Sequence, residues 1–280
     1  MAQSIISLPA MPMSVDSPSH NPAIGMVIST GYLRYLHSTS ATLEGINMTF
    51  PAGQWTCILG RSGCGKTSLL RYLAGLLDQQ VDWSGTLSLT PSHADLSLHI
   101  AYMAQQDLLM PWLSVLDNVM LSHQFGKQIA GSRSTSARKL TSEKALALLQ
   151  KVGLADSASH TVSQLSGGMR QRVALARTLM QDKPVVLMDE PFSALDAVTR
   201  YRLQDLACEL LIDKTVVLIT HDPQEAIRLA DQIYIMRGVP AAAESLNVPS
   251  SPPPRLFDAQ CAALQQEIMT CLEREDGAAQ

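Results

Sequence analysis

The chain has 280 residues, of which 46% are hydrophobic and 16% are charged, a charged share below the roughly 25% usual in soluble domains. The 21 basic and 25 acidic residues give a net charge of −4, which argues against a protein whose main role is to coat nucleic acid or an anionic membrane. Five cysteines without a CxxC pair or metal-ligand spacing indicate a reducing compartment and no zinc site. Because the N-terminus has no basic signal segment and no run of about 18 apolar residues is present, we expect a cytosolic chain unless a partner holds it at a membrane.

The composition changes along the chain and predicts three regions. Residues 1–25 mix Pro, Ser and Met without helical or strand periodicity, so we expect a disordered tail. An α/β domain is predicted over residues 26–240, with a helical part inserted at about 106–165. Residues 241–280 are predicted to form a proline-rich linker and a short amphipathic helix.

Continuous apolar runs in the α/β domain have the pattern of strands that are buried on both faces of a parallel sheet. They are Trp55–Leu59, Pro184–Met188 and Thr215–Thr220. Apolar residues at helical spacing predict helices from Lys66 onward and over residues 198–210. In the helical part, Ser142 is expected to begin a helix that Gly153 ends. Strands that alternate with helices favour an α/β crossover architecture.

A glycine-rich motif lies between the first apolar run and the helix that follows it. Gly60, Arg61, Ser62, Gly63, Cys64, Gly65, Lys66 and Thr67 fit GxxxxGK[ST], and Ser68 is the next residue of the same site. In this context the backbone N–H groups surround phosphate oxygens, Lys66 reaches the β- and γ-phosphates and the Thr67 hydroxyl binds Mg²⁺. The motif therefore predicts a P-loop.

Two adjacent acidic residues end the second apolar run. Asp189 is placed to hold Mg²⁺, and Glu190 is placed to polarise a water for attack on the γ-phosphate. By itself, such a pair is a plain strand-to-turn junction in about three of four cases, so other motifs must decide its meaning.

A second anion-binding feature precedes a predicted helix in the segment LSGGMRQR, residues 165–172. Ser166 is expected to cap this helix, and Gly167 and Gly168 leave its first N–H groups accessible. Because the chain has one P-loop and a second phosphate site, a nucleotide shared between two copies is predicted.

The segment LSGGMRQR resembles the signature sequence of ATP-binding cassette (ABC) ATPases, and the resemblance extends over about residues 28–240. It implies an α/β P-loop NTPase fold with a RecA-like core, an antiparallel β-subdomain and a helical subdomain. Gln105 matches the Q-loop glutamine, which senses Mg²⁺ and the γ-phosphate. Ser193, Ala194, Leu195 and Asp196 match the D-loop, and His221 matches the switch histidine.

Two positions depart from the usual pattern of the family. Tyr35 is our choice for the aromatic residue that stacks on adenine, although His37 fits the family spacing slightly better. Met169 replaces the commoner glutamine of the signature. Since Ser166 and Gly168 match the positions that contact phosphate in the family, we expect this change to leave hydrolysis intact.

The resemblance implies Mg²⁺-dependent ATP hydrolysis in a homodimer whose nucleotides lie between the two copies. The implied catalytic residues are Lys66, Gln105, Glu190 and His221. Thr67, Gln105 and Asp189 are implied around the metal, while Ser166, Gly167, Gly168 and Asp196 are implied at the nucleotide.

A single cassette resembles the separate ATPase subunit of an importer, peripheral on the cytoplasmic face of the inner membrane. Its implied partners are permease subunits with membrane spans and, indirectly, a solute-binding protein. Residues 105–119 are particularly similar to the nitrate, sulfonate and taurine importer group. Within that group, residues 177–180 and 203–206 resemble ATPases of hydroxymethylpyrimidine or thiamine-precursor uptake, which is the favoured substrate.

Other functional classes fit the sequence less well. A soluble ABC-type ATPase acting on DNA or ribosomes would have a long coiled coil or a second cassette, whereas only about 100 residues separate Lys66 from Ser166. A regulator without hydrolysis is disfavoured because Lys66 and Glu190 are both present. The basic stretch over residues 127–177 lacks interleaved aromatic residues, which favours a solvated helical face over a nucleic-acid partner.

Overall fold

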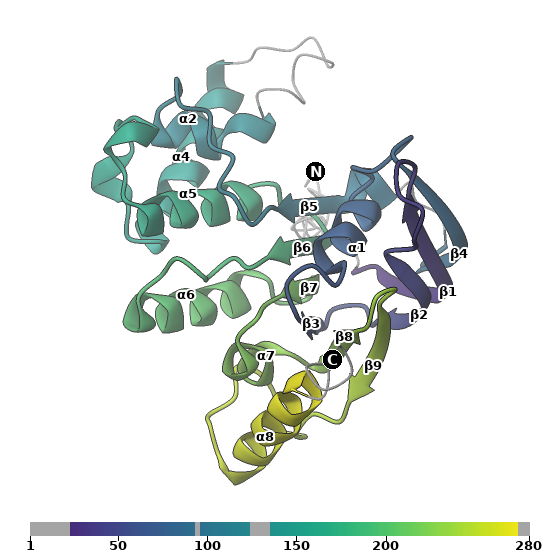
Figure 1. The fold of residues 1–280 in the computed structure, drawn as a ribbon. Helices are drawn as coiled ribbons and strands as arrows, with labels where there is room; N and C mark the ends of the chain where they lie inside the picture. The colour runs from purple at the N-terminus through teal and green to yellow at the C-terminus, as the bar shows by residue number, and fades with distance from the viewer. Residues whose placement is uncertain (1–22, 93–95, 124–134, 274–280) are drawn as a thin grey trace, which may run out of the picture.

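The computed structural model describes residues 23–92, 96–123 and 135–273 (Figure 1). The tail expected over residues 1–25 lies almost entirely outside these ranges, and the first strand begins at Gly25.

A six-stranded sheet forms the centre of the fold. Its order is β5 (Ile100–Met103), β6 (Val185–Asp189), β7 (Thr215–Ile219), β3 (Trp55–Gly60), β8 (Gln232–Arg237) and β9 (Ala242–Leu246). The first five strands are parallel, and β9 runs antiparallel to β8. The three apolar runs of the sequence thus become β3, β6 and β7, which are buried along their whole length. β9 extends the sheet beyond residue 240, where the sequence placed the end of the α/β domain.

A second, antiparallel sheet has the order β2 (Leu43–Phe50), β1 (Gly25–Tyr35) and β4 (Val81–Thr90). Its buried residues, among them Met26, Ile28 and Phe50, share a core with Leu69 and Leu70 of helix α1. This sheet is the β-subdomain that the resemblance implies.

Helices flank the central sheet and form a separate group beside it (Figure 1). The flanking helices are α1 (Lys66–Leu73), α6 (Ala197–Leu210), α7 (Pro223–Leu229) and α8 (Ala259–Glu273). The separate group holds α2 (Val115–Val119), α4 (Thr135–Lys151), α5 (Gly167–Leu179) and the short 3-10 helices η2 (Ala155–Ser157) and η3 (Val162–Gln164), while η1 (Leu96–His99) precedes β5.

One expectation about helices was wrong. Ser142 lies inside α4 rather than at its start, because the helix already begins at Thr135. The helix expected over residues 198–210 is present as α6, although Val198 at its start is 63% exposed. By contrast, Ser166 caps α5 as predicted, since its hydroxyl accepts a hydrogen bond from the backbone N–H of Met169.

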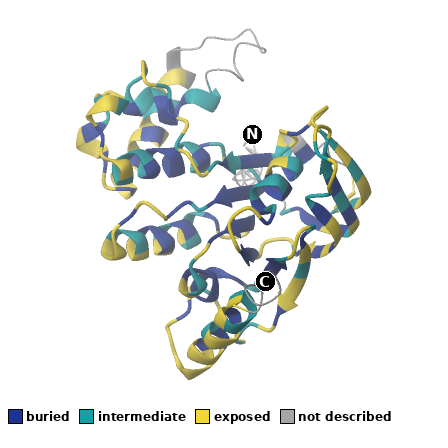
Figure 2. Cartoon of the chain, in the orientation of Figure 1, coloured by how far each residue is buried: buried dark blue, intermediate teal, exposed yellow. Residues whose placement is uncertain are grey.

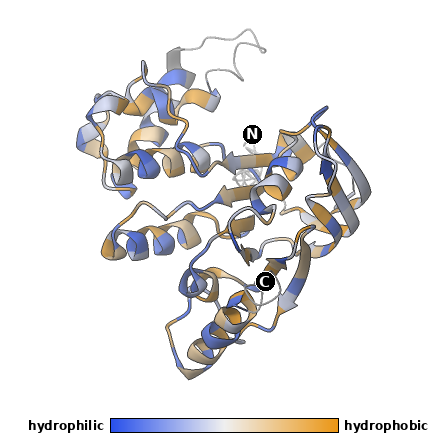
Figure 3. Ribbon diagram, in the orientation of Figure 1, coloured by the Kyte–Doolittle hydropathy of each residue, from blue (hydrophilic) through white to orange (hydrophobic). Residues whose placement is uncertain are grey.

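Two hydrophobic cores cover the opposite faces of the central sheet, and alternate residues of each strand enter different cores. On β3, Cys57 and Leu59 belong to one core and Ile58 to the other. Figures 2 and 3 show buried and hydrophobic residues gathered on these central strands. The polar groups that follow β3, β6 and β7 therefore project from the carboxyl edge of a rigid sheet.

The C-terminal segment is part of the packed structure. Cys261, Leu264 and Ile268 of α8 are buried in the core that contains Cys57. Arg255, ahead of this helix, donates a hydrogen bond of 3.0 Å to the carbonyl of Ile227 in α7. No helix in the described ranges combines the length and apolar character needed to cross a bilayer.

Candidate functional site

The P-loop connects the end of β3 to the start of α1 through a tight backbone turn. Gly60 has a φ of +154°, and a Cβ atom there would lie 2.5 Å from the carbonyl oxygen of Met236. Gly65 has a φ of +100°, and a Cβ there would lie 2.7 Å from Leu43 Cδ2. Only glycine fits both positions without rearrangement. As the N-cap of α1, Gly65 offers no side chain to the first turn, so the N-terminal N–H groups of this helix can bind an anion.

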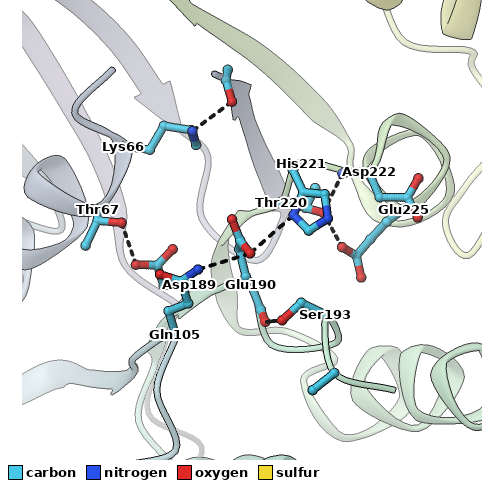
Figure 4. A network of polar contacts seen from close by, with 12 residues as sticks. Lys66, Thr67, Gln105, Asp189, Glu190, Ser193, Thr220, His221, Asp222 and Glu225 are labelled. Atoms are coloured by element: carbon cyan, nitrogen blue, oxygen red, sulfur yellow. Dashed lines mark hydrogen bonds and ion pairs between the residues drawn. The ribbon is translucent and has the colours of Figure 1, made fainter. Parts of the chain in front are cut away.

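Lys66 folds back over this loop (Figure 4). Its side chain is buried, and its Nζ donates hydrogen bonds of 2.7 Å to the carbonyls of both Gly60 and Arg61. The third donor contact of this ammonium group is to Sγ of Cys64 at 3.8 Å, a weak acceptor that a phosphate oxygen could replace. Arg61, Ser62 and Gly63 are exposed beside it.

A cluster of oxygen atoms lies next to the P-loop. The Thr67 hydroxyl donates a hydrogen bond of 2.7 Å to Oδ2 of Asp189, at the end of β6. Burial raises the pKa of Asp189 above its ordinary value, and the Thr67 hydrogen bond partly offsets this effect. A hydroxyl and a carboxylate are ligands that a hard divalent cation such as Mg²⁺ prefers, so the residues fit the expected metal.

Glu190 is the point at which two loops meet (Figure 4). Gln105 Nε2 donates to Glu190 Oε2 over 3.3 Å, and His221 Nδ1 lies 3.2 Å from the same oxygen. The sequence predicted these three side chains from separate motifs. The sheet brings them together because β6 and β7 are neighbours and both end at this edge.

The backbone of Glu190 has an unusual conformation, with a φ of +49°. Its carbonyl accepts hydrogen bonds from Gln171 Nε2 at 3.0 Å and from the Ser193 hydroxyl at 3.1 Å, and its N–H donates to Ile219. A non-glycine residue at positive φ is strained, so these three bonds are needed to fix it. Gln171 also accepts from the N–H of Ala194 at 2.8 Å.

No role was predicted for Gln171 or Ser193, although Gln171 belongs to the segment LSGGMRQR and Ser193 to the D-loop. The available signal was the position of Gln171 on α5, five residues or about 1.4 turns after the cap residue. A polar side chain at a buried place on that helix must find a partner in the sheet or in the loop after it.

The signature residues are not part of this cluster within one chain. Figure 1 shows α5 in the separate helical group, away from α1. Gly168 packs against the D-loop, since a Cβ atom there would lie 3.3 Å from the carbonyl oxygen of Ala194. Asp196 caps α6 by accepting from the N–H of Thr199 at 3.0 Å, and this backbone hydrogen bond lowers its pKa.

The two candidates for adenine stacking differ in their surroundings. The Tyr35 hydroxyl lies 3.0 Å from the Ser68 hydroxyl of α1, and its half-buried ring packs against the core of the β-subdomain. His37 is exposed in the turn after β1. Tyr35 is thus anchored beside the P-loop.

The segment after Gln105 is held on the side of α5 by two arginines. Arg170 Nε pairs with Asp107 Oδ2 at 3.1 Å, and Arg177 Nη1 donates to the carbonyl of Leu108 at 2.8 Å. Beyond these anchors, Leu108 is 55% exposed and Trp112 is 75% exposed.

A sequence profile described as ABC transporter matches residues 43–193, which is more than half of the chain. The chain belongs to the ABC transporter ATP-binding family. An ABC transporter ATP-binding protein of Haemophilus influenzae is 45% identical over 230 residues, covering 81% of this chain and 90% of the relative. As a member of the family, the chain binds ATP and is an ATPase whose hydrolysis is coupled to transport.

Other relatives are named by what they transport. A protein of Mesorhizobium japonicum named aliphatic sulfonates import ATP-binding protein SsuB 1 is 40% identical, covering 81% of this chain and 81% of the relative. One of Rhodococcus jostii with the same name is 39% identical, covering 88% of this chain and 92% of the relative. The dimeric ABC cassette MJ0796 bound to ADP and Pi is 28% identical with a TM-score of 0.65, covering 83% of this chain and all of that chain.

Proposed function

We propose that the chain is the ATPase subunit of an importer for an aliphatic sulfonate or a similar small organic anion. Several relatives at 36 to 40% identity bear the name aliphatic sulfonates import ATP-binding protein, and their alignments include the segment after Gln105 that first indicated this group. Uptake of a hydroxymethylpyrimidine or thiamine precursor, which short runs in the sequence favoured, finds no support among these relatives.

The convergence of Lys66, Asp189, Glu190 and His221 at the carboxyl edge of the sheet supports hydrolysis at this site. Lys66 exchanges a loop carbonyl for oxygens of the β- and γ-phosphates. The Glu190 carboxylate orients the attacking water and accepts its proton, while His221 and Gln105 hold one oxygen of that carboxylate. Asp189, Thr67 and Gln105 would hold Mg²⁺, which when bound neutralises phosphate charge.

We further propose that a homodimer completes each site. The P-loop residues and the signature residues Ser166, Gly167 and Gly168 are apart within one chain, so the signature of a second copy would supply the remaining phosphate contacts. Asp196 and the rest of the D-loop lie next to Gly168 and would face the same partner. The MJ0796 cassette, with which the fold is shared, is dimeric.

The permease is proposed to bind at the exposed apolar residues after Gln105. Leu108 and Trp112 are large and exposed, which suits them to a helix of a membrane partner. Arg170 and Arg177 hold the start of this segment, at Asp107 and Leu108, on α5. This contact would place the chain at the cytoplasmic face of the membrane, with a solute-binding protein on the opposite side.

A growth experiment in the source organism tests the transport proposal. Deletion of the gene should abolish growth on an aliphatic sulfonate as sole sulfur source and leave growth on sulfate unchanged. Growth that instead depends on added thiamine or its pyrimidine precursor would reject the sulfonate and support the other substrate. Complementation with Glu190→Gln tests whether uptake needs hydrolysis at this site, because this variant should restore the amount of the protein without restoring growth.

A further inference from the structure

One arginine of α6 contacts both the D-loop and the loop of the switch histidine. Arg200 Nη2 donates a hydrogen bond of 3.0 Å to the carbonyl of Leu195, in the D-loop. Its Nη1 lies 3.5 Å from Oδ2 of Asp222, the residue directly after His221. The planar fork of a guanidinium group lets one side chain fix two such acceptors in a set geometry.

A second contact of the same kind lies one turn further along α6. Gln204 Nε2 donates to Oε1 of the buried Glu225 over 3.0 Å. The Thr220 hydroxyl donates to the other oxygen of Glu225 and accepts from the N–H of Asp222 (Figure 4). Positions 200 and 204 are on one face of α6, so this helix contacts Asp222 directly and Thr220 through Glu225.

The D-loop and the switch loop are also joined at their other ends through Glu190. The Ser193 hydroxyl donates to the carbonyl of Glu190, and His221 lies 3.2 Å from the carboxylate of Glu190. Arg200 joins the same two loops a second time, at Leu195 and Asp222. A displacement of Leu195 would therefore move Asp222 and, with it, His221.

We propose that Arg200 is a positioning residue that links the D-loop to the switch loop and holds His221 against Glu190. Arg200 then ties the position of His221, and through it the Glu190 carboxylate, to the position of the D-loop. The inference rests on the proposed roles of Glu190 and His221.

Stability of the fold explains the placement of Arg200 poorly. The pair with Asp222 is about one-third exposed on both sides, and ion pairs of that exposure contribute little to folding. The Nε atom of Arg200 is buried without a hydrogen-bond partner among the described residues, which is unfavourable. What the side chain does provide is a fixed distance between two loops.

The test compares Arg200→Ala with Arg202→Ala in the full-length protein. Arg202 is exposed on the same helix, so its variant controls for the loss of a cation from α6. For Arg200→Ala we expect kcat to fall about tenfold or more while KM for ATP stays within about twofold, since the P-loop is untouched. Asp222→Asn should match it, because asparagine still caps α7 but no longer pairs with Arg200. Unchanged kcat in both variants would overturn the proposal.

Combination with His221→Ala distinguishes positioning from general damage. If Arg200 acts through His221, Arg200→Ala should cause no further loss in a His221→Ala background, as measured by single-turnover hydrolysis. Multiplied losses, or a kcat loss that follows the melting temperature, would reject the proposal. If the alanine variant misfolds, Arg200→Lys replaces it in the test, and its kcat should lie between those of wild type and Arg200→Ala. If His221→Ala and Glu190→Gln leave hydrolysis intact, the proposed site is wrong and the inference is wrong with it. If these two variants lose hydrolysis as expected and Arg200→Ala does not, only the inference about Arg200 is rejected.

Discussion

Nδ1 of His221 lies 3.2 Å from Oε2 of Glu190, and the side-chain amide of Gln105 donates to the same oxygen from the opposite loop. One carboxylate oxygen thus joins the loop after β5 to the loop after β7. The other oxygen of Glu190 is not tied by these two loops, which suits it to a water molecule.

Glu190→Gln should abolish turnover and preserve ATP binding. The amide can occupy the place of the carboxylate but cannot accept a proton from water, so kcat should fall by about 100-fold or more. ATP should then persist in the site and stabilise a dimer, which size-exclusion chromatography with light scattering would detect. The exposed Glu44 of β2 provides the control Glu44→Gln. A Glu190→Gln protein that stays monomeric with ATP contradicts the assignment.

Asp189→Asn should stabilise the protein in the absence of nucleotide and Mg²⁺. Because burial raises the pKa of Asp189, the folded state holds this proton more tightly than the unfolded state. The stability linked to that proton is complete below pH 3.8, the ordinary value, and is lost as pH rises through the higher folded pKa. Asparagine mimics the protonated form, so the variant should melt above wild type at pH 7 and the gap should close toward pH 3.8. Equal melting temperatures of wild type and Asp189→Asn at pH 7 would refute this prediction. The control is Asp78→Asn, which changes an exposed aspartate and should leave the melting temperature unchanged.

Hydrolysis should rise faster than linearly with protein concentration in the dilute range, because each site of the proposed dimer needs two copies. Ser166→Ala should lower kcat without weakening ATP binding by the monomer, which equilibrium binding at low concentration would check. Met169→Gln is the matched control. Met169 gives Ser166 only its backbone N–H, so turnover should change less than about tenfold, or 1.4 kcal/mol. A strictly linear concentration dependence argues against the shared site.

Tyr35→Ala should weaken ATP binding, while Tyr35→Phe should preserve it. Stacking needs the ring, whereas the hydroxyl serves to contact Ser68. Titration with ATP and with a base-free triphosphate separates adenine contacts from phosphate contacts, because Tyr35→Ala should weaken the binding of ATP and leave the binding of the base-free triphosphate unchanged. Should His37→Ala lose ATP affinity and Tyr35→Ala keep it, the stacking role passes to His37.

The parts of the fold that the sequence predicted correctly depend on patterns and contacts of residues that are close together in the chain. β3, β6 and β7 are continuous apolar runs that end in polar residues, and this pattern has few other solutions. Ser166 was recognisable as a cap because an N-cap contact spans only a few residues. Ser142 was misjudged for a related reason, since serine also occurs inside exposed helices.

The contacts that hold the site together could not be predicted in this way. Gln171 and Glu190 are 19 residues apart, and Gln204 and Glu225 are 21 residues apart. Polar residues on a helix ordinarily face solvent, and only the packing of α5 and α6 against the rest of the fold shows that Gln171 and Gln204 do not. β9 was missed similarly, because its residues form a strand only by pairing with the edge of β8.

Helix α5 connects two parts of the chain, with consequences for how force would pass through the molecule. Ser166 and Gly168 stand at its beginning, and the loop with Leu108 is fastened along its side by Arg170 and Arg177. A short helix bends little, so if a permease binds at Leu108 as proposed, a push on this residue would reach the signature as a rigid displacement. In the proposed dimer the signature faces the nucleotide of the other copy, so each membrane contact would act first on that nucleotide and not on the one at the chain's own P-loop.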